Sequence, residues 1–89
     1  MAVITHTDGK TTEVKPNDKS GFSLEELQGY VGGLIQVVPY SATETDISYI
    51  NEEGLLLGLP YNYVASSTFG VDLVGDVITV PFTEERGDA

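Results

Sequence analysis

His6 is the only histidine in the sequence, so it is the only imidazole that could act as a general base. A catalytic dyad or triad also needs a nucleophile and a third group that orients the base. The sequence has no cysteine, and no serine lies in a nucleophile motif. We therefore expect His6 to be an exposed strand residue. We assign no catalytic residue, and the sequence favours a protein that is not an enzyme.

Two pairs of adjacent carboxylates could do acid–base work on a sugar or contribute to a cation site. Glu25 and Glu26 lie where carboxylates cap the start of a helix, so helix capping accounts for them. Glu52 and Glu53 lie in an expected turn, and their spacing from Asp46 is not that of a calcium loop. The sequence therefore predicts no metal site and no cofactor.

Tyr61, Asn62 and Tyr63 are the most prominent candidates for a binding surface. Two tyrosines around an amide could stack a nucleotide base, or they could close the core beneath a loop, and we favour the second interpretation. The turn at residues 51–54 is a further candidate, although structure alone could explain it if Gly54 has a positive φ. The candidate binding residues are Asn51, Glu52, Glu53, Tyr61, Asn62 and Tyr63.

Charge is the strongest feature of the composition. Fourteen Asp and Glu face four Lys and Arg, the formal net charge is −10, and no Lys or Arg occurs between residues 20 and 83. Direct binding to nucleic acid or to an anionic membrane is disfavoured, because both need basic side chains. A basic protein partner is permitted, and the negative field would accelerate its approach. Solubility alone is the other explanation.

The length of 89 residues allows one domain with one core. We expect that domain in residues 1–83 and an acidic, flexible tail in residues 84–89. The sequence contains no run of about 18 apolar residues, the length needed to span a membrane. The first residues lack the features of a signal peptide, and the absence of cysteine is typical of a reducing compartment. The expected location is the cytoplasm.

A hairpin and a helix are the first elements that would position these residues. Residues 2–14 predict a β-hairpin that turns at Asp8 and Gly9. Ser23 and Glu26 form a capping box at the start of a helix that residues 32–33 end. Gly29 inside this helix suggests a close approach of another backbone. The helix is expected to bury Leu24, Leu27, Tyr30, Val31 and Leu34.

The second half of the chain predicts short strands and one short helix. Strands are expected at residues 34–38, 47–50 and 76–82, with residues 55–57 returning from a turn, and Asn62 should cap a helix over residues 63–69. The expected class is α+β: a mixed or antiparallel sheet of about four or five strands with one main helix on one face. The opening ββαβ order resembles a ubiquitin-like β-grasp, in which the strand after the helix lies beside the first strand.

Three stretches, at residues 24–33, 49–62 and 74–78, carry a family resemblance. Their order and spacing resemble a family of small uncharacterised proteins, a domain of unknown function, from bacteriophages, plasmids and bacteria. The resemblance covers most of the chain and implies an origin in a mobile element, without an activity or catalytic residues. The chain departs from the family pattern in a long loop at residues 40–46 and in lacking a basic residue after Leu55.

These features favour a non-enzymatic interaction protein of phage or mobile-element type that binds a host macromolecule. In its sharpest form it is a nucleic-acid mimic that occupies a basic nucleic-acid-binding protein of the host, with carboxylates in place of phosphates. The alternative is a protein that binds or sequesters a small nucleotide signal, although the basic side chains that phosphates prefer are missing from residues 20–83. Residues 55–57 could also serve homo-oligomerisation.

Overall fold

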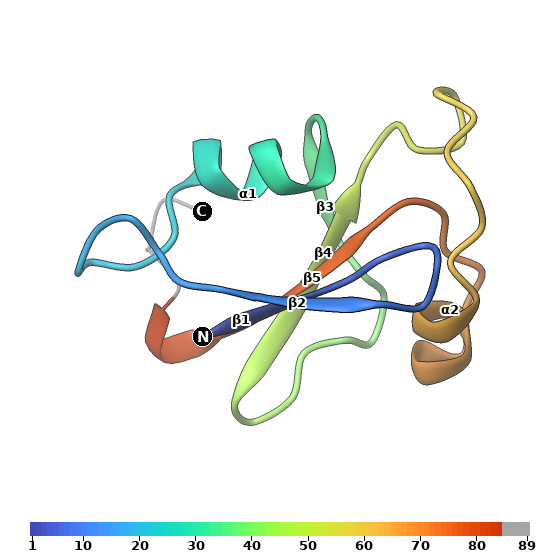
Figure 1. Cartoon of the computed structure of the whole chain (residues 1–89). Helices are drawn as coiled ribbons and strands as arrows, with labels where there is room; N and C mark the ends of the chain where they lie inside the picture. Colours follow the sequence, from blue (N-terminus) through green and yellow to red (C-terminus); the bar gives the residue numbers. More distant parts are fainter. Residues whose placement is uncertain (85–89) are drawn as a thin grey trace.

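Five strands form one sheet in the computed structural model, which describes residues 1–84 (Figure 1). The strands are β1 (Ala2–Thr5), β2 (Thr11–Val14), β3 (Ile35–Val37), β4 (Asp46–Asn51) and β5 (Val77–Pro81). The helices are α1 (Leu24–Val31), α2 (Tyr63–Phe69) and the short 3-10 helix η1 (Phe82–Glu84). The strand order is β2-β1-β5-β4-β3, and all neighbouring strands are antiparallel. The predicted α+β class with an antiparallel sheet is confirmed.

Local signals in the first third of the chain are confirmed. The hairpin of β1 and β2 turns through Gly9, whose φ is 88°. Ser23 Oγ accepts a hydrogen bond from the Glu26 amide at 3.1 Å, and the Glu26 carboxylate accepts one from the Ser23 amide at 3.1 Å. Gly32 ends α1 with a left-handed φ of 82°. Side-chain and glycine chemistry therefore fixes both ends of the helix.

The β-grasp-like strand order is wrong. β3 follows α1 but lies at the far edge of the sheet, where it pairs with β4, and β5 takes the place beside β1. A strand that is covered on both of its faces needs apolar side chains on both of them. β5 meets that condition, because Val77, Ile78 and Val80 are fully buried, whereas Gln36 and Val37 in β3 are exposed.

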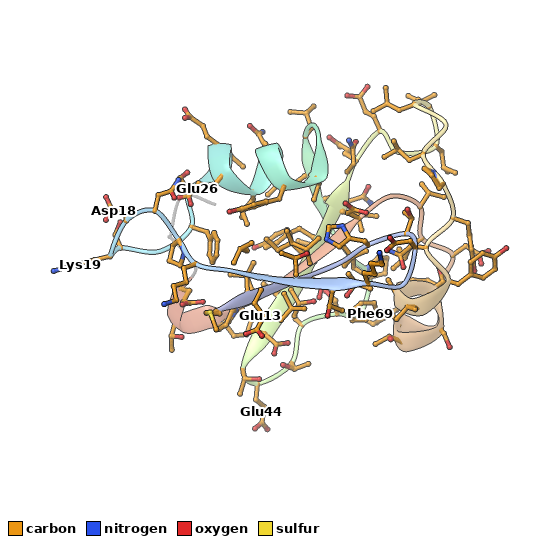
Figure 2. All side chains as sticks on the ribbon, viewed as in Figure 1. Glu13, Asp18, Lys19, Glu26, Glu44 and Phe69 are labelled. Atoms are coloured by element: carbon orange, nitrogen blue, oxygen red, sulfur yellow. The ribbon has the colours of Figure 1, made fainter. Side chains whose placement is uncertain are left out.

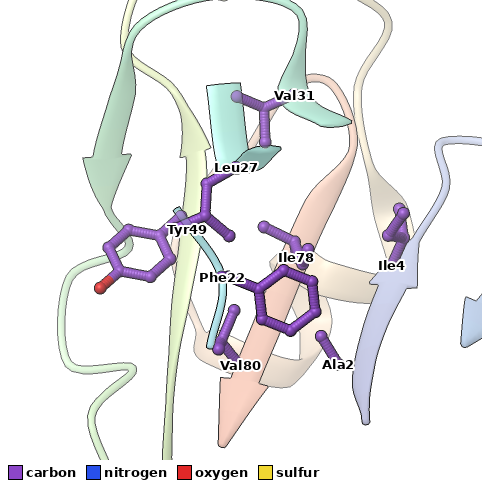
Figure 3. Packing of buried hydrophobic residues seen from close by; sticks show 8 residues of the cluster. All are labelled: Ala2, Ile4, Phe22, Leu27, Val31, Tyr49, Ile78 and Val80. Atoms are coloured by element: carbon purple, nitrogen blue, oxygen red, sulfur yellow. The ribbon is translucent and has the colours of Figure 1, made fainter. Parts of the chain in front are cut away.

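The core is divided between the two faces of the sheet. Because side chains alternate along a strand, Ile78 and Val80 of β5 face α1, while Val77 faces α2. Thus a second helix covers part of the face that α1 leaves open. The cluster beneath α1, seen in Figure 3, contains Ala2, Ile4, Phe22, Leu27, Val31, Tyr49, Ile78 and Val80. The cluster around α2 contains Val38, Ala65, Leu73 and Val77.

Two leucines that were expected in the core are exposed, and residues 55–57 differ from the predicted structure. Of the predicted face of α1, Leu27 and Val31 are buried, but Leu24 and Leu34 lie at the surface. Residues 55–57 do not form a return strand and instead belong to a run of turns. The sheet offers such a strand no place beside β4, because β3 and β5 already flank it. The close approach of another backbone that was expected at Gly29 is also not found, since nothing lies within 4 Å of where a Gly29 Cβ would be.

The last described residues form η1. Glu84 was assigned to the tail, but it ends η1, and its carbonyl accepts a hydrogen bond from the Phe22 amide at 2.6 Å. The rest of the predicted tail, residues 85–89, lies outside the described residues. Within residues 1–84, no helix has the length and hydropathy needed to cross a bilayer.

Candidate functional site

Exposed apolar side chains gather in one segment of the chain. Twelve large hydrophobic side chains are exposed among residues 1–84, and six of them lie within residues 55–64. Leu55 and Leu56 are 84% and 85% exposed, which is far beyond the partial exposure common for surface leucines. We call this set the apolar patch: it consists of Leu55, Leu56, Leu57, Tyr61, Tyr63 and Val64.

The three leucines sit on an ordered turn structure, the leucine loop, formed by residues 52–58. Backbone hydrogen bonds within it run from the Leu57 amide to the Glu53 carbonyl at 3.0 Å and from the Gly58 amide to the Leu55 carbonyl at 3.2 Å. Gly58 has a φ of 68°, which a glycine adopts without strain. In Figure 1 the loop is the yellow segment that extends beyond the end of β4. Its leucines are thus held outward by defined backbone geometry.

The base of the leucine loop packs against the segment that precedes β5. A Cβ on Gly54 would lie 2.9 Å from Val74 Cγ2, and one on Gly75 would lie 2.8 Å from Leu59 Cδ1. Gly54 was expected to have a positive φ, but its conformation is ordinary, and lack of space explains the glycine instead. Nearby, the Gly75 amide donates to the Pro60 carbonyl at 2.8 Å. The loop is therefore anchored where it leaves the body of the domain.

A groove of about 470 Å³ runs between the leucine loop and the segment before β5. Glu52 and Asp72 are the ionisable acids in its lining, and no basic side chain lines it. The Tyr61 hydroxyl donates a hydrogen bond to Asp72 Oδ1 at 2.9 Å, which holds this carboxylate beside the aromatic ring. The complete lining is Ile50, Asn51, Glu52, Gly54, Leu55, Tyr61, Asp72, Leu73 and Val74.

Tyr61 and Tyr63 connect the groove to the surface of α2. Their rings meet edge to face, with centroids 4.6 Å apart and an interplanar angle of 74°. Tyr63 and Val64 in turn line a shallow hollow of about 370 Å³ on α2, together with Ser67 and Thr68. The shared groove and the ring contact thus link Leu55 with the first turn of α2.

Two of the candidate binding residues prove to be buried scaffold. Asn51 Nδ2 donates to the Val31 carbonyl at 3.1 Å, and Asn51 Oδ1 accepts from the Glu53 amide at 2.8 Å. Asn62 caps α2 by accepting from the Ala65 amide at 3.0 Å. Its Nδ2 also donates to the carbonyls of Thr5 and Gly75, both at 2.9 Å. The side-chain amides of both asparagines thus form hydrogen bonds within the fold.

The other four candidate residues lie at the surface around the groove or next to it. Glu52 and Tyr61 line the groove, Glu53 follows Glu52 in the leucine loop, and Tyr63 extends the aromatic surface towards α2. Asp72 was not predicted as a site residue, because its contact with Tyr61 joins residues eleven positions apart. Leu55 was not among the candidate binding residues either, although residues 55–57 were considered for homo-oligomerisation. The signal that could have found it is an apolar run that directly follows a complete strand and turn.

His6 lies outside this surface and is less exposed than expected. Its Nδ1 is 2.9 Å from Asp76 Oδ2, and its Nε2 is 2.8 Å from Thr12 Oγ1. Asp76 Oδ1 also accepts a hydrogen bond from the Thr7 amide at 3.2 Å. The carboxylate, imidazole and hydroxyl thus connect the residue before β5 with β1 and β2, and a cross-strand structural role explains them. Within the described residues, no group of three or more His, Asp or Glu could hold a metal ion.

Comparison with known proteins gives a family without an assigned activity. A family model described as a domain of unknown function, DUF3846, matches residues 1–89. No curated protein and no solved structure matches the chain.

Proposed function

The chain belongs to the DUF3846 family of domains of unknown function, and from that premise we propose that it is a non-enzymatic interaction protein that binds a basic host protein. The observation that supports this proposal most directly is the one-signed charge of the body. Residues 20–83 contain eight acids and no Lys or Arg. Five of these acids are exposed: Glu25, Glu44, Glu52, Glu53 and Asp72.

The carboxylates are distributed around the molecule. Figure 2 shows Glu26 at the start of α1 and Glu44 at the far side of the molecule, on the connection before β4. A field of this kind attracts a basic protein from many directions and accelerates the encounter. Host proteins that bind nucleic acid carry a basic surface, so the proposed partner belongs to that class. The chain would be encoded by a phage or similar element and would meet this partner in the host cytoplasm. Carboxylates then take the places of phosphates.

Affinity capture tests this function. The immobilised chain is incubated with nuclease-treated bacterial lysate and washed at increasing salt. We expect the chain to capture basic nucleic-acid-binding proteins. These should elute below about 0.5 M salt, because screening weakens exposed charge pairs. Duplex DNA should also displace them from the chain. A variant with the five exposed acids changed to amides should capture none of them. Retention of partners that is unchanged at high salt, or retention by the neutralised variant, contradicts the proposal.

A second candidate, a binder of small nucleotide signals, is supported by the groove and by the ring of Tyr61 at its edge. A volume of about 470 Å³ lies within the range of small-molecule sites. Against it, Glu52 and Asp72 would repel the phosphates of a nucleotide. A thermal-shift assay with a panel of nucleotides decides between the two, because a bound ligand raises the unfolding temperature. Stabilisation by any member would favour this second function.

A further inference from the structure

We infer that the apolar patch and the adjoining groove form the docking site for a short amphipathic segment of the partner that carries arginine and aliphatic side chains. This inference rests on the proposed function and assigns the surface of the chain at which the proposed partner binds. The aliphatic side chains of that segment would cover Leu55, Leu56 and Leu57. An arginine beside them would enter the groove between Glu52 and Asp72.

The first argument is the cost of leaving the leucines in water. Concentrated exposed apolar surface on a soluble domain is characteristic of interaction sites, whereas single exposed residues are not. Leu57, like its two neighbours, is more than half exposed. Leu55 lines the same groove as Tyr61, whose ring contacts that of Tyr63. Covering this surface releases the free energy of apolar hydration, about 25 cal/mol for each Å² removed from water.

The second argument is that the leucine loop is already ordered. Its internal hydrogen bonds and the contact of Leu59 with Gly54 and Gly75 hold the backbone before any partner arrives. Binding therefore loses little backbone entropy, and the affinity gained from apolar contact is retained. An apolar run held on a defined turn differs in this respect from a frayed loop.

The third argument is the chemistry of the groove, which selects the cationic part of the segment. The hydrogen bond from Tyr61 to Asp72 places a carboxylate at the edge of an aromatic ring. A guanidinium group can stack on such a ring and donate to the carboxylate at the same time, which an ammonium group does less well. Glu52 lines the same groove and adds a second negative charge. Arginine is therefore the side chain that matches this groove.

Charge also argues against a second copy of this chain as the occupant. Each copy carries a formal net charge of −10, and Glu52, Glu53 and Asp72 lie at or next to the patch. A symmetric dimer through the patch would bring these like charges together, which opposes association at low and moderate salt. A cationic segment turns the same carboxylates into attractive contacts.

The test is an NMR titration of the full-length ¹⁵N-labelled chain with two synthetic peptides at about 50 mM salt. One peptide is a helix-forming sequence in which pairs of arginines alternate with pairs of leucines. The other has serine in place of every leucine and carries the same net charge. We expect the first peptide to shift the amide signals of residues 50–64 and 72–74 and to bind at least about tenfold more tightly than the second.

Matched variants locate the site. The double change Leu55→Ser with Leu56→Ser should weaken the binding of the arginine–leucine peptide at least about tenfold, while Leu24→Ser with Val37→Ser, at exposed apolar residues elsewhere, should change it less than about twofold. Asp72→Asn should weaken it about three- to fivefold, and Glu44→Gln, with the same loss of charge, should not. Thermal unfolding of each variant verifies that the fold is intact.

Each other outcome has a defined meaning. Equal binding of both peptides, with shifts over residues 23–26 and 43–46, would overturn the docking site and leave the proposed function standing. Failure of both peptides to bind would overturn both. Sedimentation that shows a dimer of the free chain, lost on the double leucine change, would assign the patch to a second copy and overturn the inference.

Discussion

Asn51 occupies the space that Gly33 leaves open. A Cβ on Gly33 would lie 2.9 Å from Asn51 Nδ2, so no larger residue fits there while the amide keeps its position. In that position the amide holds the carbonyl of Val31 at the end of α1 and the amide of Glu53 at the start of the leucine loop. One buried side chain thus fixes the end of the helix and the base of the proposed docking site together.

Replacing Asn51 with alanine should lower the free energy of unfolding by about 2 kcal/mol, because two backbone groups lose their partner in a buried setting. Chemical denaturation measures the change. Asn17→Ala is the matched control, since this asparagine is exposed, and it should change the stability by less than about 0.5 kcal/mol. Equal effects of the two changes would contradict the scaffold role.

The two glycines of the α1 region should respond to alanine in opposite directions. Gly33→Ala displaces Asn51 and should destabilise the protein by about 1–3 kcal/mol. Gly29→Ala lies inside α1 with nothing within 4 Å of the new methyl group, so higher helix propensity should stabilise the protein by up to about 1 kcal/mol. Thermal and chemical unfolding of the pair checks the sign of each change.

Asn62 should be among the most sensitive polar positions. Asn62→Ala removes the cap of α2 and leaves the carbonyls of Thr5 and Gly75 without this donor, so stability should fall by about 2–4 kcal/mol. Asn62→Ser restores only the capping oxygen and should recover about 1 kcal/mol of that loss. If serine restored full stability, the two carbonyl contacts would have no energetic role.

Gly54→Ala should destabilise the protein by about 1–3 kcal/mol, because the new methyl group meets Val74 at 2.9 Å. The companion change Val74→Ala removes the obstructing Cγ2 atom. In a double-mutant cycle the two changes together should cost less than the sum of their separate costs. Strict additivity, measured by denaturant unfolding, would show that another contact makes this position sensitive.

Substitutions at exposed and at buried leucines should have very different effects on the free energy of unfolding. Leu56→Ser removes a side chain that is mostly in water, so stability should change by less than about 0.5 kcal/mol. Leu27→Ala removes a fully buried side chain beneath α1 and should cost about 2–5 kcal/mol. A large loss of stability for Leu56→Ser would mean that the leucine loop packs inward in solution, which would remove the apolar surface on which the docking site depends.

What the sequence predicted well depends on interactions between near neighbours. The capping box of Ser23 and Glu26 and the hairpin turn at Gly9 act within a few residues, so their patterns are visible in the chain itself. The strand order was mispredicted, because the place beside β1 is decided by burial on both faces of β5, some 70 positions away.

The candidate site was predicted in part for a related reason. An asparagine that binds a ligand and one that binds a distant carbonyl look alike in a sequence, so Asn51 and Asn62 were selected although both are internal to the fold. Glu52 and Tyr61 were selected as separate candidates, and the groove they share with Asp72 arises only when residues 72–74 fold against the leucine loop.

The pairing of β1 with β5 has a consequence for synthesis on the ribosome. The first strand of the chain finds its inner neighbour only in residues 77–81, so the middle of the sheet joins the two ends of the sequence. Contacts this distant close large loops and slow folding. A nascent chain that has not yet released β5 can form its hairpin and its capped helix, but it has no strand on which to close its interior. Closure of the core is therefore expected only after residues 77–81 have left the ribosome, and the leucine loop emerges before the segment that anchors it.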